Sequence, residues 1–211
     1  MSTTKRLTLL GQVQACRACA HGSTRKQVVF AKGDPLSSLC FVGEAPGAEE
    51  DEQGIPFVGD AGKLLDKQIA AMREYAAGIG VDFPASPYVY NVLKCRPPNN
   101  KLLSDGSDIA ACSAHLWAQL RLLPNLKVIV ALGRVAAQTL LASDETISRL
   151  RLRAYEEHPP GIWPAKEEFV DKACVFPTYH PAYLLRRRND TALHAEAWAD
   201  LKRAVDTLEE K

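Results

Sequence analysis

The sequence predicts an α/β protein of three layers (α/β/α), a central parallel sheet of four strands with helices on both faces. Short apolar runs alternate along the chain with longer stretches in which apolar residues recur at helical spacing. Such alternation is typical of βαβ units, in which a helix joins two parallel strands. No internal repeat, low-complexity segment or linker divides the 211 residues, so we expect a single domain over residues 1–211.

Four apolar runs are the predicted strands. Residues 39–42 form the first, which ends at a glycine, and residues 88–93 form the second. Residues 128–132, apolar throughout, form the third, and residues 175–178 form the fourth. Runs of this length bounded by turn residues are typical of buried strands.

Helical periodicity follows every predicted strand. The first helix starts at the Gly-Asp pair of residues 59–60, and the second runs through residues 109–120. The third covers residues 135–141, directly after the third strand. The last covers residues 193–208, with one apolar stripe made of Trp198, Leu201, Val205 and Leu208.

The composition is that of a globular protein without strong net charge. A hydrophobic fraction of 46% and a charged fraction of 24% are ordinary for such proteins. A net charge of +1 argues against a histone-like or tail-like nucleic-acid binder but permits a DNA enzyme whose basic residues gather on one face. No apolar run approaches the ~20 residues that span a bilayer, and the N-terminus lacks the apolar core of a signal peptide. We therefore expect a cytoplasmic protein, outside any membrane, whose cysteines point to metal binding rather than disulfides.

Four of the cysteines are arranged like metal ligands. Cys16 and Cys19 form a Cys-x-x-Cys pair, and Cys95 and Cys112 follow far along the chain in polar or proline-rich surroundings. Four thiolates make the tetrahedral set that zinc or an iron–sulfur cluster requires. The remaining two cysteines lie in predicted strands and are typical of small buried hydrophobic residues.

Three predicted strands end in loops that carry polar and glycine residues. These loops are Gly-Glu-Ala-Pro-Gly at residues 43–47, the stretch 91–95 and Thr-Tyr-His-Pro at residues 178–181. In parallel sheets, functional sites gather at the carboxyl ends of the strands. The first loop lacks the Lys-Ser/Thr of a Walker motif, and the acidic residues 49–52 after it are typical of a solvated turn.

Single residues of these loops each allow two interpretations. Phe57 is either a loop anchor or a stacking platform for a planar ligand. Asn91 is either a turn residue or an amide that pairs with a base edge. His180, held by the following proline, is either structural or part of the same site. The run Arg186, Arg187 and Arg188 is either a solvated charge run or a phosphate-binding patch.

Taken together, these motifs resemble the family 4 uracil-DNA glycosylases, the iron–sulfur type of that superfamily. The matching stretches are residues 43–51, 54–59, 91–98 and 180–186, together with the four cysteines. The resemblance covers nearly the whole chain, and it implies the three-layer glycosylase fold. It also implies that Cys16, Cys19, Cys95 and Cys112 bind a 4Fe–4S cluster rather than zinc.

The resemblance also implies roles for individual residues. It places uracil against Gly43, Glu44 and Ala45 and stacks it on Phe57. Asn91 reads the base edge, and His180 stabilises the departing base at O2. Glu50 or Glu44 orients the water, because Ala45 stands where enzymes of the first family have Asp. Gly47 stands where those enzymes have the Tyr that blocks the methyl group of thymine.

The segment after His180 is expected to contact DNA. Leu184, with its neighbour Leu185, either wedges into the duplex beside the flipped base or packs as part of a buried helix. The three arginines after it are expected to bind the DNA backbone. No basic Lys-Arg-Arg-Ile-His insertion precedes Leu152, which favours turnover over covalent trapping of DNA. We assign no function to the irregular stretch of residues 156–163.

The predicted function is that of a monomeric uracil-DNA glycosylase of base-excision repair, acting on single- or double-stranded DNA that contains uracil. One alternative is a glycosylase of broader scope, which removes hypoxanthine, xanthine or mismatched thymine. The other is a non-catalytic protein that contains zinc or a cluster and binds nucleic acid.

Overall fold

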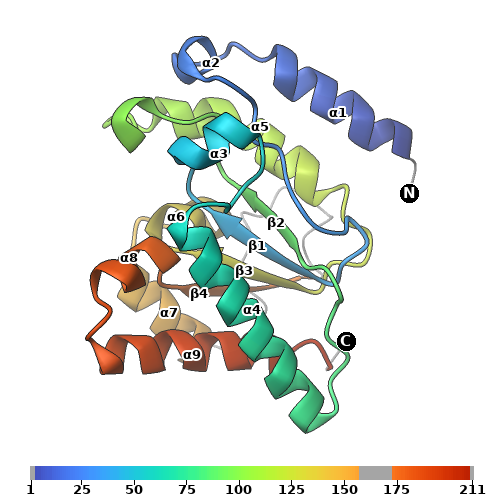
Figure 1. Cartoon of the computed structure of the whole chain (residues 1–211), viewed down its shortest axis with the longest axis vertical. Helices are drawn as coiled ribbons and strands as arrows, with labels where there is room; N and C mark the ends of the chain where they lie inside the picture. The colour runs from blue at the N-terminus through green and yellow to red at the C-terminus, as the bar shows by residue number, and fades with distance from the viewer. Residues whose placement is uncertain (1–2, 157–172, 210–211) are drawn as a thin grey trace.

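The fold is a four-stranded sheet covered by helices on both faces (Figure 1). The structure is a computed structural model, and it describes residues 3–156 and 173–209. Its strands are β1 (Leu39–Gly43), β2 (Tyr88–Asn91), β3 (Val128–Leu132) and β4 (Cys174–Thr178), in the order β2-β1-β3-β4 with every neighbouring pair parallel. The predicted fold class is therefore confirmed.

Two helices precede the first strand, and helices follow each of the four strands. They are α1 (Thr3–Ala15), α2 (His21–Thr24), α3 (Ala48–Gln53), α4 (Asp60–Ile79), the short 3-10 helix η1 (Pro98–Asn100), α5 (Ser107–Leu120), α6 (Arg134–Leu141), α7 (Ile147–Glu156), α8 (Pro181–Arg186) and α9 (Thr191–Asp206). None of those described is long and apolar enough to cross a bilayer. The four helices predicted from periodicity correspond to α4, α5, α6 and α9.

Alternating strand residues build two separate cores, one on each face of the sheet. On one face, β1 residues Cys40 and Val42 pack with apolar residues of α5, α6 and α7. On the other face, Leu39 and Phe41 of the same strand pack with α4 and α9. Because all four strands are buried along their whole length, they appear in the sequence as continuous apolar runs.

The chain order places a topological switch point between β1 and β3. The chain leaves β1, returns as β2 on one side of it and then crosses to β3 on the other side. Ligands of open α/β sheets bind beyond the carboxyl strand ends at such a switch point. At the end of β3, Gly133 (φ 87°) turns the chain directly into α6.

The structure corrects the secondary structure expected for one acidic stretch. The acidic residues 49–52 lie in a helix, α3, rather than in a solvated turn. Most of the irregular stretch 156–163, namely residues 157–163, lies outside the residues that the structure describes.

Candidate active site and sulfur pocket

Residues from three strand ends meet at one point. Gly43 and Asn91 are paired neighbours at the carboxyl ends of β1 and β2. A Cβ atom on Gly43 would lie 2.4 Å from both Asn91 Oδ1 and Phe57 Cζ, so glycine is required there for all three to pack. The ring of Phe57 stacks on that of His180, with 5.9 Å between centroids and 28° between planes. The predicted convergence of Phe57, Asn91 and His180 is thus present in the fold.

The backbone around Phe57 is tightly held. Phe57 has φ 53°, in the left-handed region, and its carbonyl accepts a hydrogen bond from Lys32 Nζ at 3.0 Å. Gly62 packs against the same carbonyl so closely that a Cβ there would lie 2.1 Å from the oxygen. These contacts fix the Phe57 ring in a buried position beside Gly43.

Asn91 has an unused hydrogen-bonding atom. Its side chain is 2% exposed, and Oδ1 has no hydrogen-bond partner among the residues that the structure describes. A buried amide oxygen without a partner is rare in folded proteins because it costs about 1–3 kcal/mol. The atom is therefore suited to receive a donor from a ligand.

His180 is held in one orientation by the helix that follows it. Its Nδ1 accepts a hydrogen bond from the main-chain N–H of Ala182 at 3.1 Å, which caps α8. Burial, with the nearby positive charge of Arg186, lowers the pKa of His180 to about 4. At neutral pH the ring is therefore uncharged. Because Nδ1 accepts, the ring proton is on Nε2.

The two candidate acids have different environments. Glu50 accepts hydrogen bonds from the main-chain N–H groups of Gly47, Val58 and Gly59 at 3.0, 2.9 and 2.9 Å. Its carboxylate therefore closes the loop that carries Phe57. Glu44 makes no such clamp, and burial raises its pKa although the charge of Arg134 partly opposes this shift.

Glu44 also lines an open cleft of about 650 Å³ that we call the Arg134 cleft. This cleft lies between the start of α6 and the loop of residues 101–106, at the switch point of the sheet. Its basic residues are Lys101 and Arg134, and its polar residues include Ser104 and Gln138. The cleft therefore offers positive charge beside the Glu44 carboxylate.

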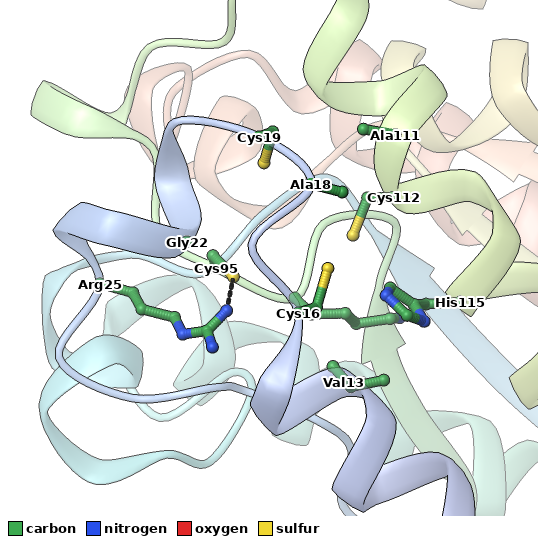
Figure 2. A pocket seen from close by; sticks show the side chains of 11 residues that line it. Val13, Cys16, Ala18, Cys19, Gly22, Arg25, Cys95, Ala111, Cys112 and His115 are labelled. Atoms are coloured by element: carbon green, nitrogen blue, oxygen red, sulfur yellow. Dashed lines mark hydrogen bonds between the residues drawn. The ribbon is translucent and has the colours of Figure 1, made fainter.

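The four predicted ligands Cys16, Cys19, Cys95 and Cys112 line one small cavity, the sulfur pocket (Figure 2). They come from the segment between α1 and α2, from the loop after β2 and from α5. None of the four is part of a disulfide. Sequence segments that are far apart thus meet at this pocket, as their spacing predicted.

The lining of the sulfur pocket suits an anionic group bound by thiolates. Arg25 Nη1 donates to Cys95 Sγ at 3.0 Å, and the buried side chain of Lys94 lines the same cavity. Burial raises the pKa of Cys95 and raises that of Cys112 to about 11, while Arg25 and Lys94 respectively oppose these shifts. Among the described residues, however, no three His, Cys, Asp or Glu side chains are grouped to hold one metal ion.

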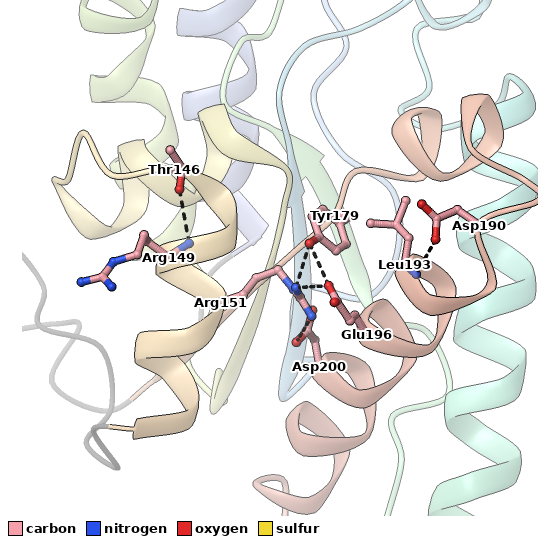
Figure 3. Close-up of polar contacts among 8 residues, drawn as sticks. All are labelled: Thr146, Arg149, Arg151, Tyr179, Asp190, Leu193, Glu196 and Asp200. Carbon is pink, nitrogen blue, oxygen red and sulfur yellow. Dashed lines mark hydrogen bonds and ion pairs between the residues drawn. The ribbon is translucent and has the colours of Figure 1, made fainter.

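A buried polar network supports the residue before His180 (Figure 3). Arg151 of α7 contacts both carboxylate oxygens of Asp200 on α9, at 2.5 and 3.1 Å. Its Nη1 donates to Glu196 at 2.7 Å and to the hydroxyl of Tyr179 at 3.0 Å, and that hydroxyl donates to Glu196 at 2.8 Å. The network fixes the end of β4 against α7 and α9.

The structure corrects the expectation for Leu184. Its side chain is 1% exposed and packs with Tyr179, Leu193 and Ala197, so it cannot enter DNA. Its neighbour Leu185 is 39% exposed. The three arginines of residues 186–188 are exposed as well. Adjacent positions on a short helix face different sides, which separates the two leucines.

Sequence reasoning gave no role to several residues of these sites. Lys94 lies inside a matched motif, and a lysine between apolar Leu93 and Cys95 was the available signal of burial. Arg134 directly follows Gly133 at the carboxyl end of β3. In a parallel α/β sheet, functional residues are expected at this position. Arg25 and Arg151 left no comparable signal, because their partners are distant in sequence.

Comparison with known proteins gives a consistent assignment. Residues 30–202 match the family model described as the uracil DNA glycosylase superfamily. The chain is 38% identical over 179 residues to a type-4 uracil-DNA glycosylase of Thermotoga maritima, covering 85% of this chain and 82% of the relative. It is 36% identical over 182 residues to that of Sulfurisphaera tokodaii, covering 84% and 74%. A type-5 enzyme of Thermus thermophilus is 34% identical over 117 residues, 52% of each chain. The chain belongs to the uracil DNA glycosylase superfamily and, within it, resembles the type-4 enzymes, as its motifs indicated.

Proposed function

We propose that the protein is a uracil-DNA glycosylase, a hydrolase that cleaves the N-glycosidic bond of uracil in DNA and so initiates base-excision repair. The observation that carries this proposal is the meeting of Phe57, Asn91 and His180 around Gly43. The relatives named type-4 uracil-DNA glycosylase give it further support.

Base recognition rests on Asn91. The target nucleotide leaves the duplex, because C1′ cannot be reached inside it, and its base stacks on Phe57. The unpartnered Asn91 Oδ1 accepts the N3–H of uracil, and the amide nitrogen donates to O4. Cytosine presents the reverse pattern and leaves two polar pairs mismatched. At about 1–3 kcal/mol for each unpaired group, discrimination of ~10²-fold or more follows.

Bond cleavage rests on His180. Negative charge grows on the departing uracil as the glycosidic bond breaks. The neutral imidazole donates its Nε2–H to O2, where a preorganised donor contributes about 3 kcal/mol. Nδ1 is already occupied by the N–H of Ala182, so the ring presents this donor without reorganisation.

Water is oriented by Glu44 rather than Glu50 in this proposal. The carboxylate of Glu50 is occupied by three main-chain donors. Glu44 lies next to the convergence point and faces the Arg134 cleft. A carboxylate there accepts a proton from the water that attacks C1′.

The DNA strand runs over the basic surface beside the site. Arg134 and Lys101 of the Arg134 cleft, together with the exposed residues 186–188, supply positive charge for phosphates. Leu185 replaces Leu184 as the residue that fills the gap left by the flipped nucleotide.

Cys16, Cys19, Cys95 and Cys112 hold a 4Fe–4S cluster in this proposal. The four cysteines line one cavity, and four cysteine thiolates are the usual ligand set of such a cluster. When bound, the cluster supplies a covalent cross-link between the segment before α2, the loop after β2 and α5. A brown protein with broad visible absorption and stoichiometric iron is expected, and a colourless protein loaded with zinc would contradict the assignment.

The deciding experiment measures alkali-labile breaks in an oligonucleotide with one uracil, single-stranded or paired with guanine, for wild-type protein and His180→Ala. We expect cleavage by the wild type and loss of most of the rate in the variant, with DNA binding retained.

Matched substrates with hypoxanthine, xanthine and a G·T mismatch test broader scope. Gly47 has no side chain that could block the 5-methyl group of thymine. A wild-type protein that binds the uracil-containing oligonucleotides but cleaves neither of them would refute the proposal.

A further inference from the structure

The sulfur pocket contains two cationic side chains and no acidic one among its lining residues. Lys94 is 1% exposed, and Arg25 reaches the pocket from the C-terminal side of α2. Within residues 3–156 and 173–209, neither forms an ion pair with a carboxylate. A buried ammonium without a counter-charge is strongly unfavourable. The protein therefore places the amine of Lys94 and the guanidinium of Arg25 in a lining whose candidates to balance a positive charge are its four cysteines.

Polar neighbours balance the Lys94 ammonium only in part. Its Nζ donates to the main-chain carbonyl of Asn91 and lies 4.5 Å from the centroid of the Tyr90 ring. A carbonyl and an aromatic face stabilise a cation but carry no net charge. Four thiolates around an iron–sulfur core leave a net negative charge in the pocket. The chemistry of the pocket thus requires cations, and Lys94 and Arg25 are those present.

The contacts of Lys94 lead directly to the base-reading loop. The ammonium holds the carbonyl of Asn91, three residues earlier in the chain. The next main-chain N–H groups bond across to the first strand-end loop, Val92 to Gly43 at 2.9 Å and Leu93 to Glu44 at 3.0 Å. A displacement of the Lys94 side chain therefore reaches Asn91, Gly43 and Glu44 together.

We infer that Lys94 and Arg25 are the counter-charges of the group bound in the sulfur pocket, and that Lys94 is a positioning residue that holds Asn91 in its base-reading geometry. The second half of this inference rests on the proposed function, whereas the first half does not. It gives a physical reason why a base-recognition loop carries a ligand of the sulfur pocket four residues after Asn91.

The experiment compares Lys94→Met, Lys94→Gln and Lys94→Arg with the wild type in the iron-loaded protein. Readouts are iron and sulfide content, the rate of iron loss to excess EDTA and the reduction potential by film voltammetry. We expect Met and Gln to lose iron at least severalfold faster and to shift the potential to more negative values, because a nearby positive charge favours electron uptake. Arg, which keeps the charge, should stay close to the wild type. Arg25→Gln, at a half-buried position, should shift the potential in the same direction as Lys94→Gln.

A second arm tests the positioning role with single-turnover uracil excision and binding to undamaged DNA. Lys94→Met should lose about tenfold in rate with unchanged binding, and Lys94→Gln, which still donates to the Asn91 carbonyl, should recover part of the loss. Lys127→Met is the matched control, because Lys127 also donates to a main-chain carbonyl (Leu208, 3.2 Å) but lies at the opposite end of the sheet. It should leave every readout unchanged.

Each half of the inference has its own contradicting result. Unchanged iron retention and potential in Lys94→Met and Arg25→Gln would overturn the counter-charge assignment, as would a Lys94→Arg protein as defective as Lys94→Met. A normal excision rate in Lys94→Met would overturn the positioning role. If the wild type excises no uracil, the proposed function fails, yet the iron and potential measurements still decide the first half of the inference.

Discussion

At the scale of single residues, main-chain contacts assign different tasks to side chains of similar chemistry. Glu44 and Glu50 lie six positions apart, yet three N–H donors occupy Glu50 and Glu44 faces the Arg134 cleft. His180 similarly has one ring nitrogen used by α8. The other ring nitrogen, Nε2, is left to donate a hydrogen bond to a ligand.

Exchanging each acid for its amide distinguishes their tasks. Glu44→Gln should lower the excision rate by about 10²-fold, the range for loss of a general base, and leave the melting temperature unchanged. Glu50→Gln should lower stability by about 1–2 kcal/mol, because an amide cannot accept from all three donors. Thermal unfolding and single-turnover rates check both. The reverse pattern would move the water-orienting role to Glu50.

The pH dependence of stability follows from His180. Its pKa falls from 6.5 to about 4 on folding, so between these values the unfolded chain binds more protons than the folded one. His180 should therefore cause the folded state to lose stability as the pH falls from 6.5 towards 4, with no effect above this window. Wild type should lose more stability than His180→Gln over this range in denaturant titrations. An imidazole NMR titration with a midpoint near 6.5 would contradict the expectation.

At the scale of helices and strands, the site depends on supports outside it. The Arg151 network joins α7 and α9 to Tyr179, which connects β4 to the His180 cap of α8 (Figure 3). Removing one partner of such a buried network is costly because the other charges are then left uncompensated. The orientation of His180 is thus coupled to helices that do not reach the base.

Tyr179→Phe tests this coupling with little change in packing. The hydroxyl bonds to Arg151 and Glu196 are removed, so stability should fall by about 1 kcal/mol and the excision rate severalfold, with DNA affinity unchanged. Tyr75→Phe is the control, because its hydroxyl also bonds a carboxylate, Asp206 at 3.0 Å, on the surface. Equal effects of the two variants on rate would show that the network has no link to His180.

At the scale of the whole molecule, nearly balanced charge conceals a local positive surface. The net charge is +1, while residues 186–188 and the Arg134 cleft place arginine and lysine near the strand ends. Binding to phosphates releases counterions, which makes DNA affinity depend on salt. The DNA affinity therefore depends on where the basic residues lie rather than on the net charge of the protein.

Replacing Arg186, Arg187 and Arg188 by Gln should weaken binding to all DNA sequences. The slope of log affinity against log salt should become shallower by about one for each phosphate that the variant no longer neutralises. Fluorescence anisotropy from low to moderate salt measures the slope. Lys202→Gln on α9 serves as the control. A slope equal to that of the wild type would mean that the run faces solvent.

Much of the fold was predictable because its signals are local. Apolar runs and helical spacing located all four strands and the helices α4, α5, α6 and α9. The same alternation predicted that strand-end loops meet, and the structure brings Phe57, Asn91 and His180 together.

The rest depends on contacts between distant residues. Helix α3 does not show in the sequence because its acidic residues lack an apolar stripe, and its capping glutamate bonds groups as far as Gly59. The sequence does not show which of Leu184 and Leu185 is buried, because the burial of Leu184 depends on its packing against Leu193 and Ala197 of α9. Arg151 and Asp200 lie 49 positions apart, and no periodicity connects them.

The Glu50 clamp has a consequence for attempts to engineer base preference. A Cβ on Gly47 would lie 2.7 Å from Glu50 Oε2, the same carboxylate that closes the Phe57 loop. A mutagenesis library at position 47 alone would therefore select mainly for loop closure, and altered substrate choice would be hidden by reduced activity. A library that varies positions 47 and 50 together is therefore better suited than one at position 47 alone to finding enzymes that act on modified pyrimidines.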